Sequence, residues 1–182
     1  MSRLGTGLSR TDWLDEGQRL LRGRGIEGVS IRALTDGLGV SKGSFYHHFK
    51  DLDDYLATLA DYFSNEQMID FFERARSQSS DDPITRLTEL AKIVLRNDGR
   101  KLMMAMRAWA KSNKAAAASV RKLDAASMDF LTEVFLDRGF DKKDARLRAY
   151  LFIASTVVDM DEKLLGLKRQ EFQDRMIALT AR

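Results

Sequence analysis

The segment from Lys42 to Lys50, KGSFYHHFK, holds the side chains of this sequence that are best suited to contact a polyanion. Its lysines, hydroxyl groups and histidine rings are donors for phosphate oxygens and for base edges. Phe45 and Phe49 are four residues apart, so on a helix they share one face, which we expect to point inward. Gly43 has no side chain and would let the backbone approach a duplex closely. This composition predicts a helix that reads DNA.

Two short helices joined by a tight turn would position these residues. Ser30 is suited to cap a first helix whose apolar residues recur at intervals of three and four. Gly39 is expected to end that helix, because glycine enters the left-handed conformation without a steric penalty. Ser41 is then expected to cap a second helix that runs through Phe49. This layout is typical of a helix-turn-helix motif, whose second helix enters the major groove.

The stretch GVSKGSFYHHFKDLDDYL resembles the signature of TetR-family transcriptional regulators, in which a Gly-Val-Ser turn leads into a Tyr-x-His-Phe helix end. The resemblance implies that one side of the second helix faces DNA, with Tyr46 as the first candidate for a phosphate contact. The family usually has a lysine at the start of the fourth helix, where this chain has Leu52, and Lys50 is the candidate to replace it. The predicted DNA-binding residues are Ser30, Arg32, Lys42, Gly43, Ser44, Tyr46, His47 and Lys50.

The aromatic and histidine side chains of this motif have other interpretations. Tyr46 and His48 are also candidates for packing, and His48 lies beside Phe45 and Phe49 in the sequence. The adjacent histidines suggest a metal, but neighbouring helical residues point in different directions, and neither a cysteine nor a carboxylate cage completes a site. We therefore expect no metal and no cofactor.

The positive charge of the chain is concentrated in its first 50 residues. Of 30 Lys/Arg and 27 Asp/Glu, this segment holds eight and five, so the remainder of the chain holds 22 of each. The net charge of +3 therefore coincides with the predicted motif. This is expected where neutralisation of phosphates contributes to affinity, although three charges alone are a small excess.

Composition argues against several other classes of protein. The chain has no cysteine and no apolar run near the roughly 20 residues that cross a bilayer, and its amino terminus lacks an apolar signal core. We therefore expect a cytoplasmic protein with no membrane contact. We do not expect an enzyme, because both histidines lie in the DNA motif and no glycine-rich phosphate loop is present.

Helical periodicity, abundant Ala and Leu, and a single proline predict an all-α protein of about nine helices. Residues 1–51 are expected to form a three-helix DNA-binding domain, and residues 52–182 a helical domain for ligand binding and dimerisation. A long helix over 51–77 would join them, followed by the linker 77–83. Further helices are expected at 83–95, 101–112, 114–138, 141–165 and 167–179.

Methionine and aromatic residues concentrate in the middle helices. The resembled family holds a small-molecule pocket there, and adaptable methionines with flat aromatic rings suit an apolar ligand. Each of these residues is also a candidate for ordinary core packing. The predicted ligand-binding residues are Tyr62, Met68, Phe72, Met103, Met106, Trp109 and Met128, with Met106 and Trp109 as first choices.

The helix expected over 141–165 is apolar nearly all round between Ala149 and Val158, so it should be covered on more than one side. It is either the central helix of a monomer or, as the resemblance implies, part of a two-fold interface formed by the last two helices. Such a dimer would place two recognition helices about 34 Å apart on an inverted repeat. The predicted interface residues are Ala149, Phe152, Ile153, Thr156 and Met176.

Together these features predict a homodimeric repressor that binds a palindromic operator on double-stranded DNA and is released by a small apolar effector. The alternative is an architectural or ligand-independent helix-turn-helix protein, whose middle helices are filled by their own side chains.

Overall fold

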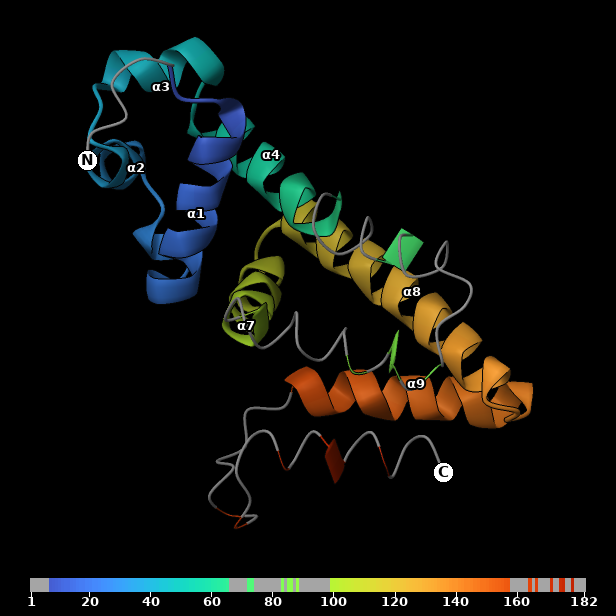
Figure 1. Cartoon of the computed structure of the whole chain (residues 1–182). Helices are drawn as coiled ribbons and strands as arrows, with labels where there is room; N and C mark the ends of the chain where they lie inside the picture. The colour runs from blue at the N-terminus through green and yellow to red at the C-terminus, as the bar shows by residue number, and fades with distance from the viewer. Residues whose placement is uncertain are drawn as a thin grey trace. The chain divides into compact units, whose positions relative to one another are not determined.

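The computed structural model describes residues 7–65, 72–73, 83, 85–86, 88, 99–157, 164, 166, 171, 174–175 and 178. This part of the chain contains seven α-helices and one short 3-10 helix and no strand (Figure 1), which confirms the all-α class. The linker 77–83 and most of the helices expected at 83–95 and 167–179 lie outside the described residues. The chain divides into two compact units, Met1–Glu66 with Ala105–Val120, and Gln67–Met104 with Arg121–Arg182. The boundary predicted after residue 51 stays a prediction.

The amino-terminal helices of the first unit begin and end where local chemistry requires it. Ser9 caps the first helix through a capping box with Asp12, and Gly25, at φ 67°, ends it. These elements are α1 (Arg10–Arg24), η1 (Ile26–Gly28), α2 (Ile31–Leu38), α3 (Lys42–His48) and α4 (Leu52–Asn65).

The predicted helix-turn-helix is present, with two differences in detail. The hydroxyl oxygen of Ser30 accepts a hydrogen bond from the Ala33 N–H at 3.1 Å, and Gly39 ends α2 in the left-handed conformation. Ser41 occupies the cap position of α3, but its side chain makes no capping hydrogen bond. The helix also ends one residue earlier than expected, because Phe49 is already extended, at φ −137° and ψ 140°.

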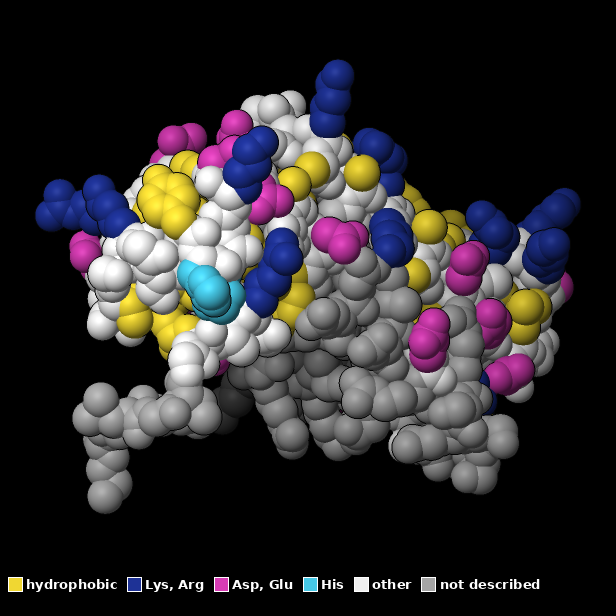
Figure 2. Space-filling view, turned by 90° about the horizontal axis from the view of Figure 1, so that it is seen from above, with side chains coloured by type: hydrophobic (Ala, Val, Ile, Leu, Met, Phe, Trp, Pro, Cys, Tyr) yellow, Lys and Arg dark blue, Asp and Glu magenta, His cyan; other side chains and the backbone are white. Residues whose placement is uncertain are grey.

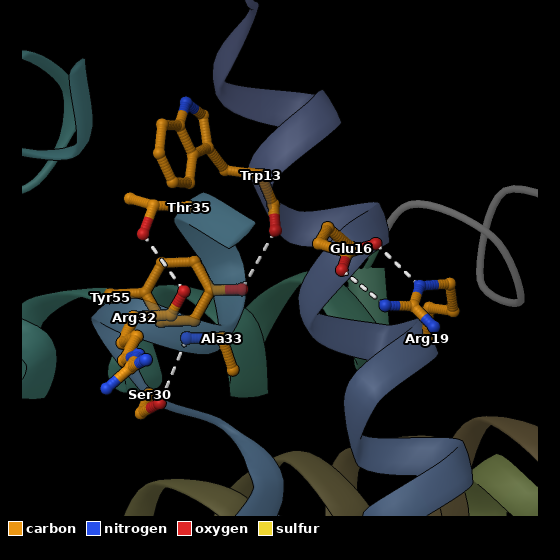
Figure 3. Close-up of polar contacts among 8 residues, drawn as sticks. All are labelled: Trp13, Glu16, Arg19, Ser30, Arg32, Ala33, Thr35 and Tyr55. Carbon is orange, nitrogen blue, oxygen red and sulfur yellow. Dashed lines mark hydrogen bonds and ion pairs between the residues drawn. The ribbon is translucent and has the colours of Figure 1, made fainter. Parts of the chain in front are cut away.

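Helix α4 crosses α1 closely, and the contact centres on Gly17. The Tyr55 hydroxyl lies where a side chain at Gly17 would begin, and it donates a hydrogen bond to the Trp13 carbonyl at 2.8 Å (Figure 3). Burial raises the pKa of the Tyr55 hydroxyl, and the negative charge of Glu16 raises it further, so the group stays protonated and remains a donor. A helix–helix contact of this kind fixes both the separation and the register of α1 and α4.

Helix α1 also approaches α2 through a glycine. A Cβ atom at Gly37 would overlap the buried carboxylate of Glu16. That carboxylate accepts two hydrogen bonds from Arg19, at 2.6 and 2.7 Å (Figure 3). The hydrogen bond from Arg19 to Glu16, and then the attraction between their charges, raise the pKa of the guanidinium.

The other described helices are α7 (Gly99–Ala110), α8 (Lys114–Asp137) and α9 (Lys142–Val157). Each lies within two or three residues of its predicted limits, except that the expected continuation of α9 to 165 is mostly outside the described residues. Gly139 follows the end of α8 with a positive φ of 93°, and the Phe140 N–H donates back to the Phe135 carbonyl. No α-helix in the described part of the chain has the length and apolar character that a bilayer crossing needs.

The contact at Gly17 predicts opposite effects for one substitution at two places in α1. Gly17→Ala should lower the free energy of unfolding by about 1–3 kcal/mol, because the new methyl group overpacks against Tyr55. Gly23→Ala is the matched control, since no atom of the described residues lies within 4 Å of its Cβ position; it should leave stability unchanged or raise it by up to about 1 kcal/mol. Urea unfolding followed by circular dichroism measures both. Equal effects at the two positions would contradict the packing argument.

Candidate nucleic-acid interface

Aromatic rings pack one side of helix α3 against α1 and α4. Phe45 and Phe49 are buried, with ring centroids 5.4 Å apart. Phe45 lies edge-on to Trp13 of α1 at 5.5 Å, and Phe49 lies edge-on to Tyr55 of α4 at 4.9 Å. The inward face predicted from the four-residue spacing is confirmed, and it contacts both neighbouring helices.

The opposite side of α3 is open to solvent. Tyr46 is 56% exposed, and Ser44 is half-buried. Both histidines of the chain lie in α3, so the histidine colour in Figure 2 marks this helix, and lysine and arginine side chains lie around it on the same face. The exposed residues of this edge are Lys42, Gly43, Tyr46, His47 and Lys50.

Gly43 is not required by the protein's own packing. Among the described residues, the atom nearest to its Cβ position is the Ser41 hydroxyl oxygen, at 3.6 Å, which is an ordinary contact. An alanine would therefore fit and would favour the helix. The missing side chain matters only for what approaches α3 from outside.

Two predicted DNA-binding residues, Ser30 and Arg32, lie at α2. Ser30 stabilises the helix, whereas the side chain of Arg32 is exposed and can reach a ligand. The Ser30 hydroxyl caps α2, as described above. Arg32 is highly exposed, and its contact with Asp36 at 3.6 Å is an exposed i,i+4 pair. Such pairs contribute little, so the guanidinium can exchange Asp36 for a phosphate at small cost.

His48 packs against aromatic rings, which was one of the two roles that its sequence position suggested. It is half-buried, with its ring centroid 6.2 Å from Trp13 and 6.3 Å from Phe49. His47 is exposed, with its ring 5.3 Å from that of His48. Only His47 is presented on the outer edge of α3.

The turn after α3 is fixed by carboxylates. The Lys50 N–H donates to the Asp54 carboxylate at 3.0 Å, and the Asp54 N–H donates to the Asp51 carboxylate at 2.8 Å. Leu52, where the resembled family has a lysine, is half-buried at the start of α4. The exposed side chain of Lys50 therefore extends from a rigid turn, two residues before Leu52.

Two residues near this edge make contacts that the sequence did not predict. Ser41 was expected to cap α3, but its exposed hydroxyl makes no capping bond and is available to a ligand. A serine before a helix is usually interpreted as a cap, so the sequence carries no sign of this. The guanidinium of Arg10 lies over Phe49 and donates to Thr58, although nothing in the local sequence indicates these contacts.

The predicted ligand-binding residues fall into both units. In the first unit, Met106 and Trp109 are buried, and the buried Tyr62 donates its hydroxyl to the Asp15 carboxylate at 2.9 Å. In the second unit, Phe72 is buried and stacks on Phe130 at 4.8 Å, and Met103 and Met128 are half-buried. Met68 lies outside the described residues. Packing accounts for Tyr62 and Phe72, and the ligand site stays a prediction.

The predicted interface residues lie mainly on the inner side of α9. Ala149 and Phe152 are 0% and 5% exposed, so both are covered within the subunit, and Ile153 is half-buried. Met176 and the side chain of Thr156 lie outside the described residues. The apolar side chains that α9 exposes are Leu147, Tyr150 and Leu151, at 55, 62 and 49%. The sequence pattern did not determine which side of α9 faces solvent, and the structure shows that it is the side with these three residues.

Among the residues that the structure describes, no group of three or more His, Asp or Glu side chains is arranged to hold a metal ion. Among the described amino-terminal helices, α3 has an exposed polar edge and is anchored by buried aromatic side chains. This arrangement suits insertion into a groove of DNA.

Residues 14–54 match the family model of the bacterial regulatory proteins of the tetR family. A transcriptional regulator from Rhodococcus sp. is 20% identical, with a TM-score of 0.71 over 96% of this chain and 94% of that chain. A TetR transcriptional regulator from Legionella pneumophila is 13% identical, with a TM-score of 0.75 over 98% and 100%. A TetR-family member from Streptomyces coelicolor is 18% identical, with a TM-score of 0.66 over 95% and 96%. At these identities the structures share the fold, and comparison with curated proteins gave no significant match.

Ser30 and Ser41, which precede α2 and α3, should contribute differently to the stability of the fold. Ser30→Ala should lower the free energy of unfolding by about 1 kcal/mol, because the Ala33 N–H loses its acceptor. Ser41→Ala should change it by less than about 0.5 kcal/mol, since its hydroxyl caps nothing. Thermal unfolding measures both variants. A loss at Ser41 as large as that at Ser30 would show that the Ser41 hydroxyl does cap α3.

Proposed function

We propose that this chain represses transcription from an inverted-repeat operator. The premise is that it is a TetR-family regulator, as its amino-terminal domain and its fold indicate. The observation that carries the proposal is the outer edge of α3, where Lys42, Tyr46, His47 and Lys50 are exposed around a glycine that the fold does not need. Arg32 of α2 adds an exposed cation. In this proposal the tyrosine and the cations contact phosphates, and His47 contacts a base edge.

The repressor acts as a homodimer in this proposal. One α3 helix reads only a few base pairs, and a second copy one helical turn away supplies the rest of the recognition. Support comes from α9, which exposes Leu147, Tyr150 and Leu151 on one side. Contiguous exposed apolar side chains of this kind are typical of an interface.

A small apolar ligand releases the dimer from DNA by moving α4. Support comes from the contacts of the first unit, in which the ends of α7 and α8 belong to the same compact body as α4. The buried Ser119 hydroxyl of α8 donates to the Ala60 carbonyl of α4, and Met106 and Trp109 are buried in this unit. A ligand that prefers one arrangement of these helices would shift α4, and with it α3 through Tyr55.

This function needs no catalytic residue and no cofactor, and it places the protein in the cytoplasm with the DNA. The competing proposal is a ligand-independent DNA-binding protein. The stacked pair of Phe72 and Phe130 favours it, because these middle-helix aromatics already fill space with each other.

Selection of the purified protein on a random duplex pool at near-physiological salt tests the proposal. We expect an enriched inverted repeat whose half-sites are centred about one helical turn, or roughly 10 base pairs, apart. Single changes within a half-site should each weaken binding by about 1–3 kcal/mol. Binding without any consensus, lost steeply as salt rises, would instead indicate phosphate contacts alone and would refute the operator. The enriched duplex then serves to screen apolar compounds by release.

The dimer has its own test on the exposed side of α9. Leu151→Glu should raise the dimer dissociation constant by at least about tenfold, because a carboxylate would be buried without a partner. Lys142→Glu is the control, since this residue is exposed at the start of the same helix. Sedimentation equilibrium gives both constants. A monomeric wild-type protein, or equal effects of the two substitutions, would refute the interface.

A further inference from the structure

We propose that Arg10 is a positioning residue that fixes the carboxyl end of recognition helix α3 against α4, and that it does not contact a phosphate. Its guanidinium carbon lies 4.8 Å from the centroid of the Phe49 ring. One of its terminal nitrogens donates to the Thr58 hydroxyl oxygen at 3.0 Å. A single side chain at the start of α1 therefore contacts both the last anchor of α3 and the middle of α4. This inference rests on the DNA binding proposed above.

Phe49 is the residue on which the end of α3 depends. It leaves the helix in an extended conformation while its N–H still donates to the Phe45 carbonyl, so its ring lies directly at the end of α3. The ring is 2% exposed, packed between Phe45 and Tyr55 and overlaid by Arg10. A planar guanidinium suits this position, because it stacks on an aromatic face and keeps its donors for a hydroxyl at the edge.

The acceptor of Arg10 is itself held in place. The Thr58 hydroxyl donates its own proton to the Asp54 carbonyl at 2.8 Å, which leaves its lone pairs for Arg10. The carboxylate of Asp54 accepts the Lys50 N–H in the turn that follows α3. A continuous series of polar contacts thus runs from Arg10 through Thr58 and Asp54 to the backbone beside the exposed Lys50.

Salt dependence distinguishes a positioning role from a phosphate contact. Each cation that neutralises a phosphate on duplex DNA adds about 0.9 to the slope of log affinity against log salt concentration. An arginine that only orients α3 adds nothing to the slope, but its loss lowers the fraction of molecules whose recognition helix is correctly placed. Its removal should therefore reduce preference for the operator over random duplex.

The experiment uses Arg10→Met, Thr58→Val and their combination, with Thr58→Ser as the matched control that keeps the hydroxyl. Affinities for the selected operator and for random duplex are measured at several salt concentrations, with the folded fraction checked by circular dichroism. We expect Arg10→Met and Thr58→Val each to weaken operator binding about two- to fivefold, the range of an exposed cation–π contact, with an unchanged slope and a reduced specificity ratio. The double variant should bind the operator no more weakly than the single variant with the lower affinity. Thr58→Ser should bind the operator like the wild type.

A slope that falls by about 0.9 in Arg10→Met, with Thr58→Val unaffected, would overturn the proposal and establish a phosphate contact. Unchanged affinity in Arg10→Met would overturn it as well. If the wild-type protein selects no operator, the proposed function fails independently of Arg10. The two single variants and the double variant are then compared by thermal unfolding without DNA, and additive losses of stability would refute the contact between Arg10 and Thr58.

Discussion

The placement of the recognition helix depends on the missing Cβ atom of Gly17. The space that it leaves admits the Tyr55 hydroxyl, which reaches the Trp13 carbonyl at 2.8 Å and completes a buried hydrogen bond. The ring that carries this hydroxyl lies against both Phe45 and Phe49, the two inward residues of α3. One side chain of α4 thus joins α1 by a hydrogen bond and α3 by ring packing, so these three helices do not move independently.

The other polar contacts between α4 and α1 extend this constraint. Thr58 accepts from Arg10, and Tyr62 donates to Asp15, so α4 is bonded to α1 at three places over two turns. The bond from Arg10 to Thr58 is exposed and individually weak. The buried bond from Tyr55 to the Trp13 carbonyl costs more to break, because an unsatisfied carbonyl would remain in the core. A displacement of α4 would therefore break the exposed contact first, while Tyr55 transmits the displacement to the rings of Phe45 and Phe49. This ordering makes α4 a suitable mechanical element for the proposed release from DNA.

The sequence predicted those parts of the fold that local chemistry determines. The Ser30 cap, the left-handed Gly39 and the spacing of Phe45 and Phe49 each act within a few residues, and each is present as predicted. Gly17 was not predicted to matter, because a glycine inside a helix has only an unfavourable propensity until its partner, 38 positions away, is in place. The exposed side of α9 was not predicted either, for a related reason. Where apolar residues surround a helix, periodicity does not determine that Ala149 faces inward and Tyr150 outward.

The comparison of Gly17 with Gly43 separates the demands of folding from those of function. Both glycines lie in helices, where each is less favourable than alanine by up to about 1 kcal/mol. At Gly17 the loss is offset by close packing of two helices, and any side chain would disrupt the core. At Gly43 the described residues make no close contact with the Cβ position, the backbone has an ordinary conformation, and the residue lies on the outer edge of α3. A loss of stability with no internal compensation is expected where an external surface, here the DNA duplex, must approach the backbone.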